Sequence, residues 1–457
     1  MARFKSPTQS PSLLPDIRPR LLPILRGRYF LVSGISIILA VSIVASFFRN
    51  DYSLLGITSG PFSKKPFQQC PVTLSSNKDG QNNGTWRFTP DRDADNYGLS
   101  FDQCQAAFPK LFVEVDKSVE ARKKANRPIT YHEMAPPKRL SDGMVRVVVD
   151  HGEVYVVEWG DLTSSTKSRA KSTLHSLHRA LIASPDRDSI PSVEFVFSAQ
   201  DFVSGDYVNQ SKPIFSYTKR DDDESIWLMP DFGYWAWPDV RVGAYRDVRR
   251  RIARVESEVG FPQKKQLVWR GSLSEAPELR GKLLKQTRGK HWASIRVLDW
   301  ESDEDLRVNL LSIEDHCRYM FLAHTEGRSF SGRGKYLFNC RSVVISHRLI
   351  WREAHHAALI ASGPGQNYVE VERDFSDLEE KVEYLLDHPD AAERIAENSV
   401  ATFRDRYLTP AAEACYWRYL LQQYASVCDF IPDIYETSDR GVQELRGVPY
   451  EEWVLMN

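Results

Sequence analysis

Three features of the sequence predict an α/β fold with two doubly wound halves. Short apolar runs of strand length alternate with longer segments whose apolar residues recur at helical spacing. Basic, glycine-containing turns follow two of the apolar runs, and turns of this kind bind ligands at the carboxyl edge of open parallel sheets. The alternating segments divide into two halves near residues 245–262, so we expect a cleft between the halves.

The composition indicates a globular protein and points to no particular partner. The 457 residues are enough for about two or three domains. Because 60 Lys and Arg residues nearly balance 61 Asp and Glu residues, no net charge favours a nucleic acid as partner. Six cysteines occur without the spacing of a zinc site, and their even number is compatible with disulfides.

An apolar segment near the N-terminus predicts membrane attachment. Residues 29–48 carry no charged side chain, and a helix of this length, at about 1.5 Å per residue, crosses the hydrocarbon layer. Most charged side chains ahead of it are cations, which predicts a cytosolic tail over residues 1–28 and a single-pass, type II signal anchor. A cleaved signal peptide is the alternative, but its apolar region is usually shorter. The remainder is therefore expected in the lumen of the Golgi or endoplasmic reticulum.

Residues 49–98 follow the anchor and are predicted to form a stem. They are rich in Ser, Pro, Gly and Asn and show little periodicity. A lumenal location allows cysteines to form disulfides. It also exposes two glycosylation sequons, at Asn83 and Asn209.

The first half begins where helical periodicity appears, at residue 99. Its predicted elements are a helix from Phe101 toward Arg127, a β-hairpin of strands 144–150 and 154–158, a helix over 168–184 and a strand over 193–198. The second half begins with a basic helix over 245–258. Its predicted strands cover 266–270, 294–298, 342–346 and 368–371. Helices are predicted over 278–287, after a capping box of Ser376 and Glu379, from Pro389 onward, and over 409–427.

Asp201 is the first candidate for a catalytic residue. It lies at the carboxyl end of the apolar strand 193–198, where a carboxylate facing a cleft can remove a proton from a hydroxyl group. Asp206 is the alternative candidate. An aspartate in such a place is also common as a turn or helix-cap residue without a catalytic role.

Two basic turns in the second half predict a site for a diphosphate. The first ends in Ser272 and joins a strand to a helix that carries Arg280, and the amino end of a helix favours phosphate. The second is a glycine-rich loop with Arg328 and Arg333, followed by Lys335. Glycine permits close approach of the backbone to a ligand, and arginine binds phosphate through two donors. Ordinary turns with solvated arginines are the alternative.

An aromatic cluster lies near the boundary between the halves. Its members are Trp227, Phe232, Tyr234, Trp235 and Trp237. Such rings either belong to the core or stack on sugars and line a pocket. Because prolines flank the cluster, Trp235 and Trp237 are candidates for a pocket on the acceptor side.

Two acidic runs, over residues 220–224 and 301–305, contain the Asp-x-Asp pattern that some transferases use to bind Mn²⁺ or Mg²⁺. Both runs follow polar, loop-like sequence, which favours a solvated surface. No metal site is therefore predicted.

A spaced set of motifs resembles a known family. The motifs are Asp201-Phe202, Trp269-Arg270-Gly271-Ser272, Arg280, Asp315-His316-Cys317, Ser331, Arg333, Lys335, Leu337-Phe338, Cys340 and Cys415-Tyr416-Trp417. In these residues the chain resembles the CAP10-like, protein O-glucosyltransferase family, glycosyltransferase family 90. The resemblance covers about residues 140–428. The stem and the region before residue 99 are similar to those of fungal-type, membrane-anchored members.

The resemblance implies a GT-B fold, in which two Rossmann-like domains face a cleft. Residues 99–245 would form the acceptor-side domain with the catalytic base, residues 246–435 the donor domain, and residues 436–457 a C-terminal tail. It further implies an inverting transfer of a sugar, commonly glucose or xylose, from a UDP-sugar to a hydroxyl acceptor on protein or glycan. A non-catalytic lumenal protein that uses the same fold to hold glycans or partners is the alternative.

The resemblance also assigns roles to single residues. Asp201 matches the general base, and the donor-pocket positions are Ser272, Arg280, Ser331 and Arg333. Since Arg280 and Arg333 would neutralise the departing diphosphate, we expect no metal cofactor. Cys317 matches a cysteine paired with Cys340. Cys415 matches a cysteine that pairs with the N-terminal region, where Cys104 is favoured over Cys70.

Overall fold

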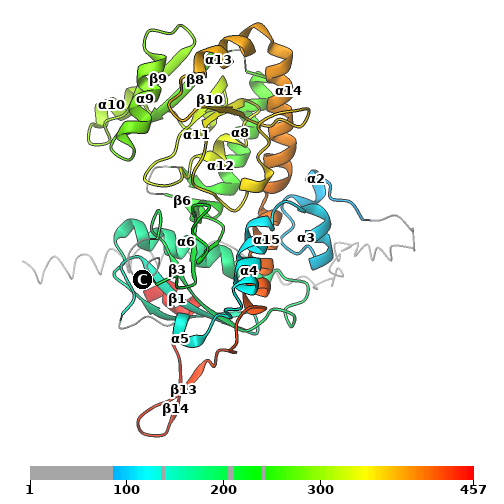
Figure 1. The fold of residues 1–457 in the computed structure, drawn as a ribbon, viewed down its shortest axis with the longest axis vertical. Helices are drawn as coiled ribbons and strands as arrows, with labels where there is room; N and C mark the ends of the chain where they lie inside the picture. Colours follow the sequence, from blue (N-terminus) through cyan, green and yellow to red (C-terminus); the bar gives the residue numbers. More distant parts are fainter. Residues whose placement is uncertain (1–85, 135–138, 204–209, 239–241, 263, 457) are drawn as a thin grey trace, which may run out of the picture. The chain divides into compact units, whose positions relative to one another are not determined.

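The computed structural model describes residues 86–456 except 135–138, 204–209, 239–241 and 263. These residues belong to one compact unit, Asn83–Asn457, in which helices pack against two main β-sheets (Figure 1). The predicted α/β class is confirmed.

The predicted membrane anchor, residues 29–48, lies outside the described residues, as do the cytosolic tail and the sequons at Asn83 and Asn209. Across the part of the chain that the structure describes, no helix is long and apolar enough to cross a membrane. The first described element is the short helix α2 (Pro90–Asp93), which falls within the predicted stem.

The first sheet has the strand order β15-β2-β1-β3-β4-β5. Its strands are β1 (Met144–Asp150), β2 (Glu153–Trp159), β3 (Val193–Ser198), β4 (Ile214–Ser216), β5 (Ile226–Leu228) and β15 (Val448–Pro449). The predicted hairpin is confirmed. His151 and Gly152 form its turn with φ of 47° and 77°, and positive φ at both positions suits a two-residue hairpin.

This first sheet is mixed and not purely parallel, in contrast to the Rossmann-like domain that was expected. β3, β4 and β5 run parallel, whereas β1 pairs antiparallel with both β2 and β3. The reason is the tight turn between β1 and β2, because strands joined by two residues can only run antiparallel.

Two long helices pack against each other beside the first sheet, α6 (Ser164–Ile182) and α15 (Pro410–Ala425). The Trp417 indole donates to Ser176 Oγ at 2.9 Å, and Tyr416 Oη donates to the Leu228 carbonyl at 3.0 Å. The chain therefore returns to the first half after completing the second. The sequence pattern predicts the helix but not this return.

The predicted continuous helix from Phe101 toward Arg127 is wrong in one respect. Two helices, α3 (Phe101–Ala107) and α4 (Val113–Lys124), replace it. Pro109 lies between them, and proline lacks the N–H that would continue a helix. A capping box of Ser100 and Gln103 begins α3. The short helix α5 (Tyr131–Met134) follows α4.

The predicted C-terminal tail, residues 436–457, is largely structured. β13 (Tyr435–Thr437) and β14 (Gln443–Leu445) form a separate hairpin that projects from the first sheet (Figure 1). β15 then pairs with β2, and α16 (Tyr450–Met456) follows it. Trp453 of α16 is fully buried and its ring lies 6.0 Å from that of Trp159. Burial of this indole explains why the segment is held to the sheet.

The second sheet is entirely parallel and has the order β12-β11-β10-β8-β9. Its strands are β8 (Lys264–Gly271), β9 (Ala293–Val297), β10 (Tyr319–His324), β11 (Val343–His347) and β12 (Val369–Val371). Each contains or overlaps a predicted strand, except β10. The order reverses between β8 and β10, so the sheet has a topological switch point there.

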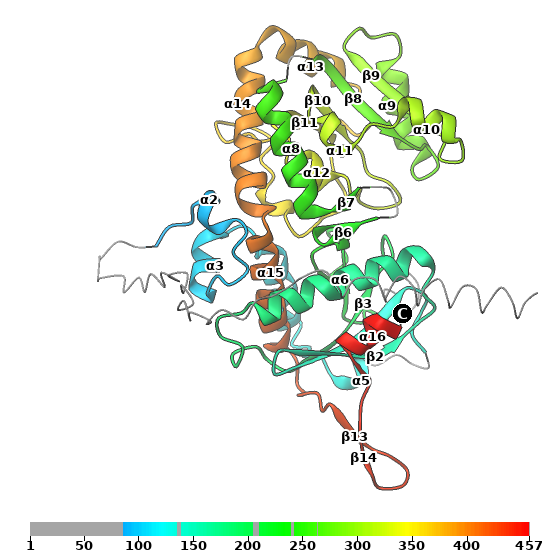
Figure 2. The same cartoon turned by 180° about the vertical axis from the view of Figure 1, so that it is seen from behind.

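Helices lie on both faces of the second sheet. α8 (Tyr245–Val259) lies on the face toward the viewer in Figure 2, and α9 (Pro277–Thr287) lies on the opposite face. The other helices of this half are α10 (Asp303–Asn309), α11 (Ile313–His316), α12 (Gly334–Leu337), η2 (His356–Ala358), α13 (Leu378–Asp387), α14 (Pro389–Ser399) and the π-helix η3 (Val400–Tyr407).

The predicted capping box of Ser376 and Glu379 is wrong. α13 begins at Leu378, one residue later than that box requires, and its N-cap Asp377 caps no backbone N–H of the helix. The Asp377 carboxylate instead accepts from the Glu372 backbone N–H at 2.8 Å and pairs with Lys381 at 2.7 Å.

Both predicted disulfides are confirmed. Cys317 pairs with Cys340, and Cys104 pairs with Cys415, with Cα–Cα distances of 5.1 and 5.6 Å. The sequence separations are 23 and 311 residues, so the second bridge ties α3 to α15 across nearly the whole described chain. Among the described residues Cys428 is the free cysteine.

The two disulfides should differ in their effect on stability. A cross-link restricts the unfolded chain more when it closes a longer loop, so replacing Cys104 and Cys415 by Ala should cost about 5 kcal/mol. Replacing Cys317 and Cys340 should cost about 3 kcal/mol. Guanidinium unfolding of both double variants and the parent measures the two losses. Equal losses would contradict the expected dependence on loop length.

Candidate active site

The candidate site lies at the switch point of the second sheet. The segment after β8 carries Ser272, and the segment between β10 and α12 carries Ser331 and Arg333. Since β8 and β10 are neighbouring parallel strands, both segments leave the sheet at the same edge. This edge is where open α/β sheets bind ligands.

Arg280 lies in the first turns of α9, and its side chain contacts both segments. Its Nη1 donates to the Ser272 carbonyl at 2.6 Å, and its Nε donates to the Glu326 carbonyl at 3.2 Å. The side chain is buried, and burial lowers the pKa of Arg280. No carboxylate forms an ion pair with Arg280 among the described residues, although the charge of Glu275 acts on it from a distance.

Arg333 is the N-cap residue of α12 and its guanidinium lies against β8. Its Nη1 donates to the Arg270 carbonyl. A Cβ at Gly271 would lie 2.8 Å from the Trp269 ring and 3.3 Å from Arg333 Nη2, so only glycine fits there. Burial, and secondly the charge of Arg280, lower the pKa of Arg333 to about 10. Within residues 86–456 as described, Arg333 also lacks a carboxylate partner.

Two neighbouring cations that form no ion pair with a carboxylate among the described residues favour an anionic ligand. Each guanidinium has lost part of its hydration, and each raises the cost of charging the other. A bound anion would relieve both effects, and the planar donors of arginine match phosphate oxygens. The prediction of a diphosphate site at these residues therefore remains the hypothesis that fits the geometry.

Ser272 precedes Arg280 in the sequence, and Ser331 precedes Arg333. Ser272 Oγ hydrogen-bonds to Ser274 Oγ at 2.8 Å and accepts from the Ser274 N–H at 3.1 Å. The Ser331 carbonyl accepts from the Gly334 N–H at 2.8 Å and so begins α12. Both serines are partly exposed and can reach a ligand.

The glycines of the loop allow it to pack closely against the rest of the protein. This packing explains them better than the approach of a ligand to the backbone does. A Cβ at Gly334 would lie 2.6 Å from the His324 ring, and one at Gly332 would lie 3.1 Å from Trp237. At Gly327 it would lie 3.3 Å from Arg280 Nη2. The glycines let the loop lie close to β10, to the aromatic cluster and to Arg280.

Two further cations of this loop are not available to a phosphate. Lys335 is fully buried and its Nζ lies 2.5 Å from Asp231 Oδ1. It holds α12 against η1 (Phe232–Tyr234) of the first half. Arg328 is 63% exposed and pairs with Glu275 at 2.8 Å.

Asp201 lies three residues after the end of β3, and its carboxylate is 34% exposed. Arg169 Nη1 of α6 donates to Asp201 Oδ1 at 2.7 Å. Ser329 Oγ donates to the Asp201 carbonyl at 2.5 Å, so the loop with Arg333 touches the segment of the candidate base. The structure thereby brings together residues that lie 128 positions apart. The alternative candidate Asp206 lies outside the described residues.

A cavity of about 650 Å³ adjoins Arg333. Its walls are mostly apolar and include Trp237, Leu298, Trp300, Leu306 and Leu310. Trp237 comes from β6 (Ala236–Trp237), which pairs with β7 (Gly243–Ala244), whereas the others follow β9 or lie around α10. An apolar cavity with a cation at its side suits a planar ring joined to a phosphate.

His316 also lines this cavity and is neutral. Its Nδ1 lies 2.8 Å from the Ser312 carbonyl, which requires that this nitrogen carry the proton. Its Nε2 is then an acceptor, and it has no partner among the described residues. Burial, followed by the charge of Arg333, lowers the pKa of His316 to about 4.

The other predicted pocket residue, Trp235, does not line this cavity. Its ring stacks on His175 at 4.7 Å and lies under Arg179 at 4.8 Å. Of the aromatic cluster, Trp227 belongs to the core and is fully buried. Trp235 ends the 3-10 helix η1 with φ of −93° and ψ of −71°, whereas Trp237 lies on the strand β6, and this change of backbone conformation lets the two rings enter different surroundings.

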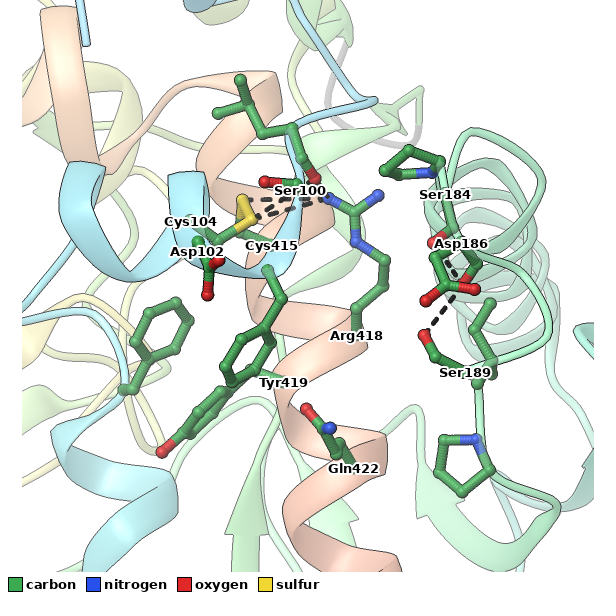
Figure 3. Close-up of a pocket in the computed structure, with 16 residues that line it drawn as sticks. Ser100, Asp102, Cys104, Ser184, Asp186, Ser189, Cys415, Arg418, Tyr419 and Gln422 are labelled. Atoms are coloured by element: carbon green, nitrogen blue, oxygen red, sulfur yellow. Dashed lines mark hydrogen bonds between the residues drawn. A yellow bond between two sulfur atoms is a disulfide. The ribbon is translucent and has the colours of Figure 1, made fainter. Parts of the chain in front are cut away.

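A second cavity, of about 240 Å³, lies beside the Cys104–Cys415 disulfide (Figure 3). Arg418 reaches across it and donates to the Tyr97 and Leu99 carbonyls, both at 2.9 Å. Its Nη2 also lies 3.6 Å from Cys104 Sγ. These bonds join α15 to the segment before α3. Arg418 therefore has a structural role at this cavity.

Side chains of both acidic runs form contacts within the protein. Asp221 pairs with Arg352, and Asp305 accepts from the Asp299 N–H and from Asn309 Nδ2. Ser302 caps α10 at the start of the second run. No group of three or more His, Cys, Asp or Glu residues that could hold a metal ion occurs in the described part of the chain.

Glu353 is a buried carboxyl group that the sequence motifs did not indicate. It follows β11, near the Asp231–Lys335 pair. Burial, and then the charge of Asp231, raise the pKa of Glu353 to about 8. The folded protein therefore holds this proton in a pH range where the unfolded chain, with an ordinary value of 4.5, has released it.

The contribution of Glu353 to the free energy of unfolding should accordingly fall as the pH rises from 4.5 toward 8. The Glu353→Gln variant carries no such proton, so its melting temperature should exceed that of the parent by more at pH 8 than at pH 5. Thermal unfolding of both proteins at the two pH values checks this. A difference that is the same at both pH values would contradict the assignment.

Comparison with known proteins gives a consistent result. A model of the family described as glycosyl transferase family 90 matches residues 104–446. The chain is 26% identical over 270 residues to an "O-glucosyltransferase rumi homolog" of Aedes aegypti, which covers 54% of this chain and 64% of that protein. It is 26% identical over 262 residues to "Protein O-glucosyltransferase 1" of Homo sapiens, covering 53% and 64%. The alignments thus span less than two thirds of these curated relatives.

Proposed function

Because the chain belongs to glycosyl transferase family 90, we propose that it transfers a sugar from a UDP-sugar to a hydroxyl group on a protein or glycan. Glucose and xylose are the sugars we expect. The observation that carries the proposal is the pair Arg280 and Arg333, two buried or partly buried cations without carboxylate partners among the described residues. The relatives named O-glucosyltransferase support the same reaction type.

The donor would occupy the switch point of the second sheet. Its uracil ring fits the apolar cavity between Trp237 and Trp300, where neutral His316 can accept a hydrogen bond from an N–H or O–H group. Its diphosphate would lie against Arg333 and Arg280. In this proposal the second half is the donor domain of a GT-B-like enzyme, and the first half, whose sheet is mixed, is the acceptor side.

Asp201 would act as the general base. The acceptor O–H bond breaks as its proton passes to the Asp201 carboxylate, and the oxygen forms a bond to the anomeric carbon. The bond from that carbon to the phosphate oxygen breaks, and UDP departs with the electron pair. Attack from the face opposite UDP inverts the anomeric configuration. Arg280 and Arg333 would stabilise the charge that develops on the diphosphate, so a divalent metal is not required.

The two disulfides support a lumenal location, because such bonds persist in oxidising compartments. We include in the proposal that residues 29–48 anchor the protein in a Golgi or endoplasmic reticulum membrane with the catalytic unit in the lumen.

Release of UDP tests the proposal directly. The purified protein is incubated with a panel of UDP-sugars, including UDP-glucose and UDP-xylose, and with serine-containing peptides or oligosaccharides as acceptors. We expect one or two UDP-sugars to be consumed, with activity that persists in EDTA. Loss of activity in EDTA would refute the metal-independent mechanism. A thermal shift with UDP but no turnover of any UDP-sugar would favour a binding protein.

A further inference from the structure

Arg169 contacts the candidate base directly. It lies on α6, its side chain is 16% exposed, and its Nη1 donates to Asp201 Oδ1 at 2.7 Å. The other carboxylate oxygen, Oδ2, has no hydrogen-bond donor among the described residues. Counting only the residues that the structure describes, one oxygen of the carboxylate is therefore bound to the protein and the second is not.

The plane of the Arg169 guanidinium is set by an aromatic ring. Its central carbon lies 4.8 Å from the centroid of Phe232, and this buried ring packs edge-on against Tyr217 at 5.3 Å and Trp237 at 5.4 Å. An arginine stacked in this way presents its donors in a defined direction, which a flexible lysine does not. The direction here is toward Asp201.

A second contact holds the main chain of the same residue. Ser329 is fully buried, and its hydroxyl donates to the Asp201 carbonyl at 2.5 Å. Ser329 belongs to the loop that carries Arg333. The backbone of Asp201 is thus attached to the loop of the expected donor site, and its side chain is attached to α6.

We propose that Arg169 is a positioning residue, which orients the Asp201 carboxylate so that its free oxygen faces the acceptor hydroxyl. The inference rests on the proposed transfer reaction. Arg169 does not touch the reacting atoms. It binds Oδ1, which leaves Oδ2 to take the acceptor proton as the new bond to the anomeric carbon forms.

The other ionisable groups near this pair do not replace Arg169. Asp231 faces the same region but is bound to Lys335 at 2.5 Å. Tyr217 lies nearby and hydrogen-bonds to Thr173 at 2.7 Å, and burial raises the pKa of Tyr217, so it stays neutral. Arg169 is the cation in hydrogen-bond contact with Asp201 among the described residues.

Arg179 offers a matched control on the same helix. It likewise pairs with a carboxylate, Glu413, at 2.8 Å, and lies 4.8 Å from an aromatic ring, that of Trp235. It makes no contact with Asp201. A loss common to the Arg169→Gln and Arg179→Gln variants would therefore report on the stability of α6, whereas a loss confined to Arg169→Gln would report on the base.

The experiment measures kcat, donor KM and kcat/KM for the parent, Arg169→Gln, Arg169→Lys and Arg179→Gln, with the UDP-sugar that the parent consumes. We expect Arg169→Gln to lower kcat by about 10²-fold, with donor KM nearly unchanged, because the base is misplaced. Arg169→Lys should recover part of kcat, since lysine restores the charge but not the planar donors of arginine.

Three outcomes would overturn the inference. They are an unchanged kcat in Arg169→Gln, an equal loss in Arg179→Gln, or a rise in donor KM that accounts for the whole effect. If Arg169→Gln does not fold, Arg169→Lys with a parental kcat would overturn it as well. An inactive parent would refute the proposed function itself, whereas an active parent with unaffected Arg169 variants would refute only the positioning role.

Discussion

Replacing Asp201 by asparagine is expected to lower the rate of sugar transfer by about 10²- to 10⁴-fold, the range in which a general base contributes. Asparagine has nearly the shape of aspartate and can still accept from Arg169, so the segment between β3 and β4 should keep its structure. What it lacks is the ability to take the proton of the acceptor hydroxyl. The loss should therefore appear in kcat, and UDP should bind almost as tightly as to the parent.

Asp222→Asn is a suitable control, because Asp222 is an exposed carboxylate in a turn of the same half. It should transfer sugar at the parental rate. Initial rates of UDP release and calorimetric titration with UDP measure the two properties for each variant. Parental turnover by Asp201→Asn would show that another group removes the proton.

Removing the charge of Arg333 is expected to weaken the donor site by about 10- to 100-fold in donor KM or in the Kd for UDP, since hydrogen bonds between charged groups contribute about 1.5–3 kcal/mol. The Arg333→Ala variant leaves Arg280 as the main cation at the switch point. Because the same charge also stabilises the departing diphosphate, kcat should fall as well. The two effects together distinguish a residue that binds the donor from one that only shapes the loop.

Arg328→Ala is the matched control within the same loop. Arg328 is 63% exposed and its ion pair with Glu275 is at the surface, where such pairs contribute little. Its replacement should change donor KM by less than about twofold. If Arg333→Ala and Arg328→Ala had equal, small effects, the diphosphate would have to bind elsewhere.

Much of the second half could be predicted from local patterns. The strand β11 is buried on both faces and forms a short apolar run, and the helices carry apolar stripes that recur every three to four residues. The equally buried β10 is the strand that the pattern does not predict. The basic turn after β8 is also predictable from the sequence. A strand that ends in glycine and serine, with an arginine on the helix that follows, is a pattern of residues close together in the chain. The cavity wall at Leu298 and Trp300 has no such signature, because its residues come from a loop and a short helix.

The first half was predicted less well. Its hairpin is predictable from two apolar runs around His151 and Gly152, whereas the edge strand β15, which joins β2 from the far end of the chain, is not. The break at Pro109 has a local cause that the helical spacing obscured. Residues 436–457 looked like a tail because their hairpin is polar, whereas a single buried indole, Trp453, holds the last helix in place.

The sequence by itself determined the α/β class, most of the strands and helices, and, through the resemblance of its motifs, the family and both disulfide pairs. It also predicts the candidate base and the arginines that we expect to bind the donor. These properties depend on residue type and spacing along the chain. Only the tertiary structure decided that Lys335 is buried against Asp231, that Trp237 and not Trp235 lines the cavity, and that Arg169 and Ser329 hold Asp201. Contacts of this kind join residues up to 128 positions apart, and their partners are selected by packing and burial, which local periodicity does not encode.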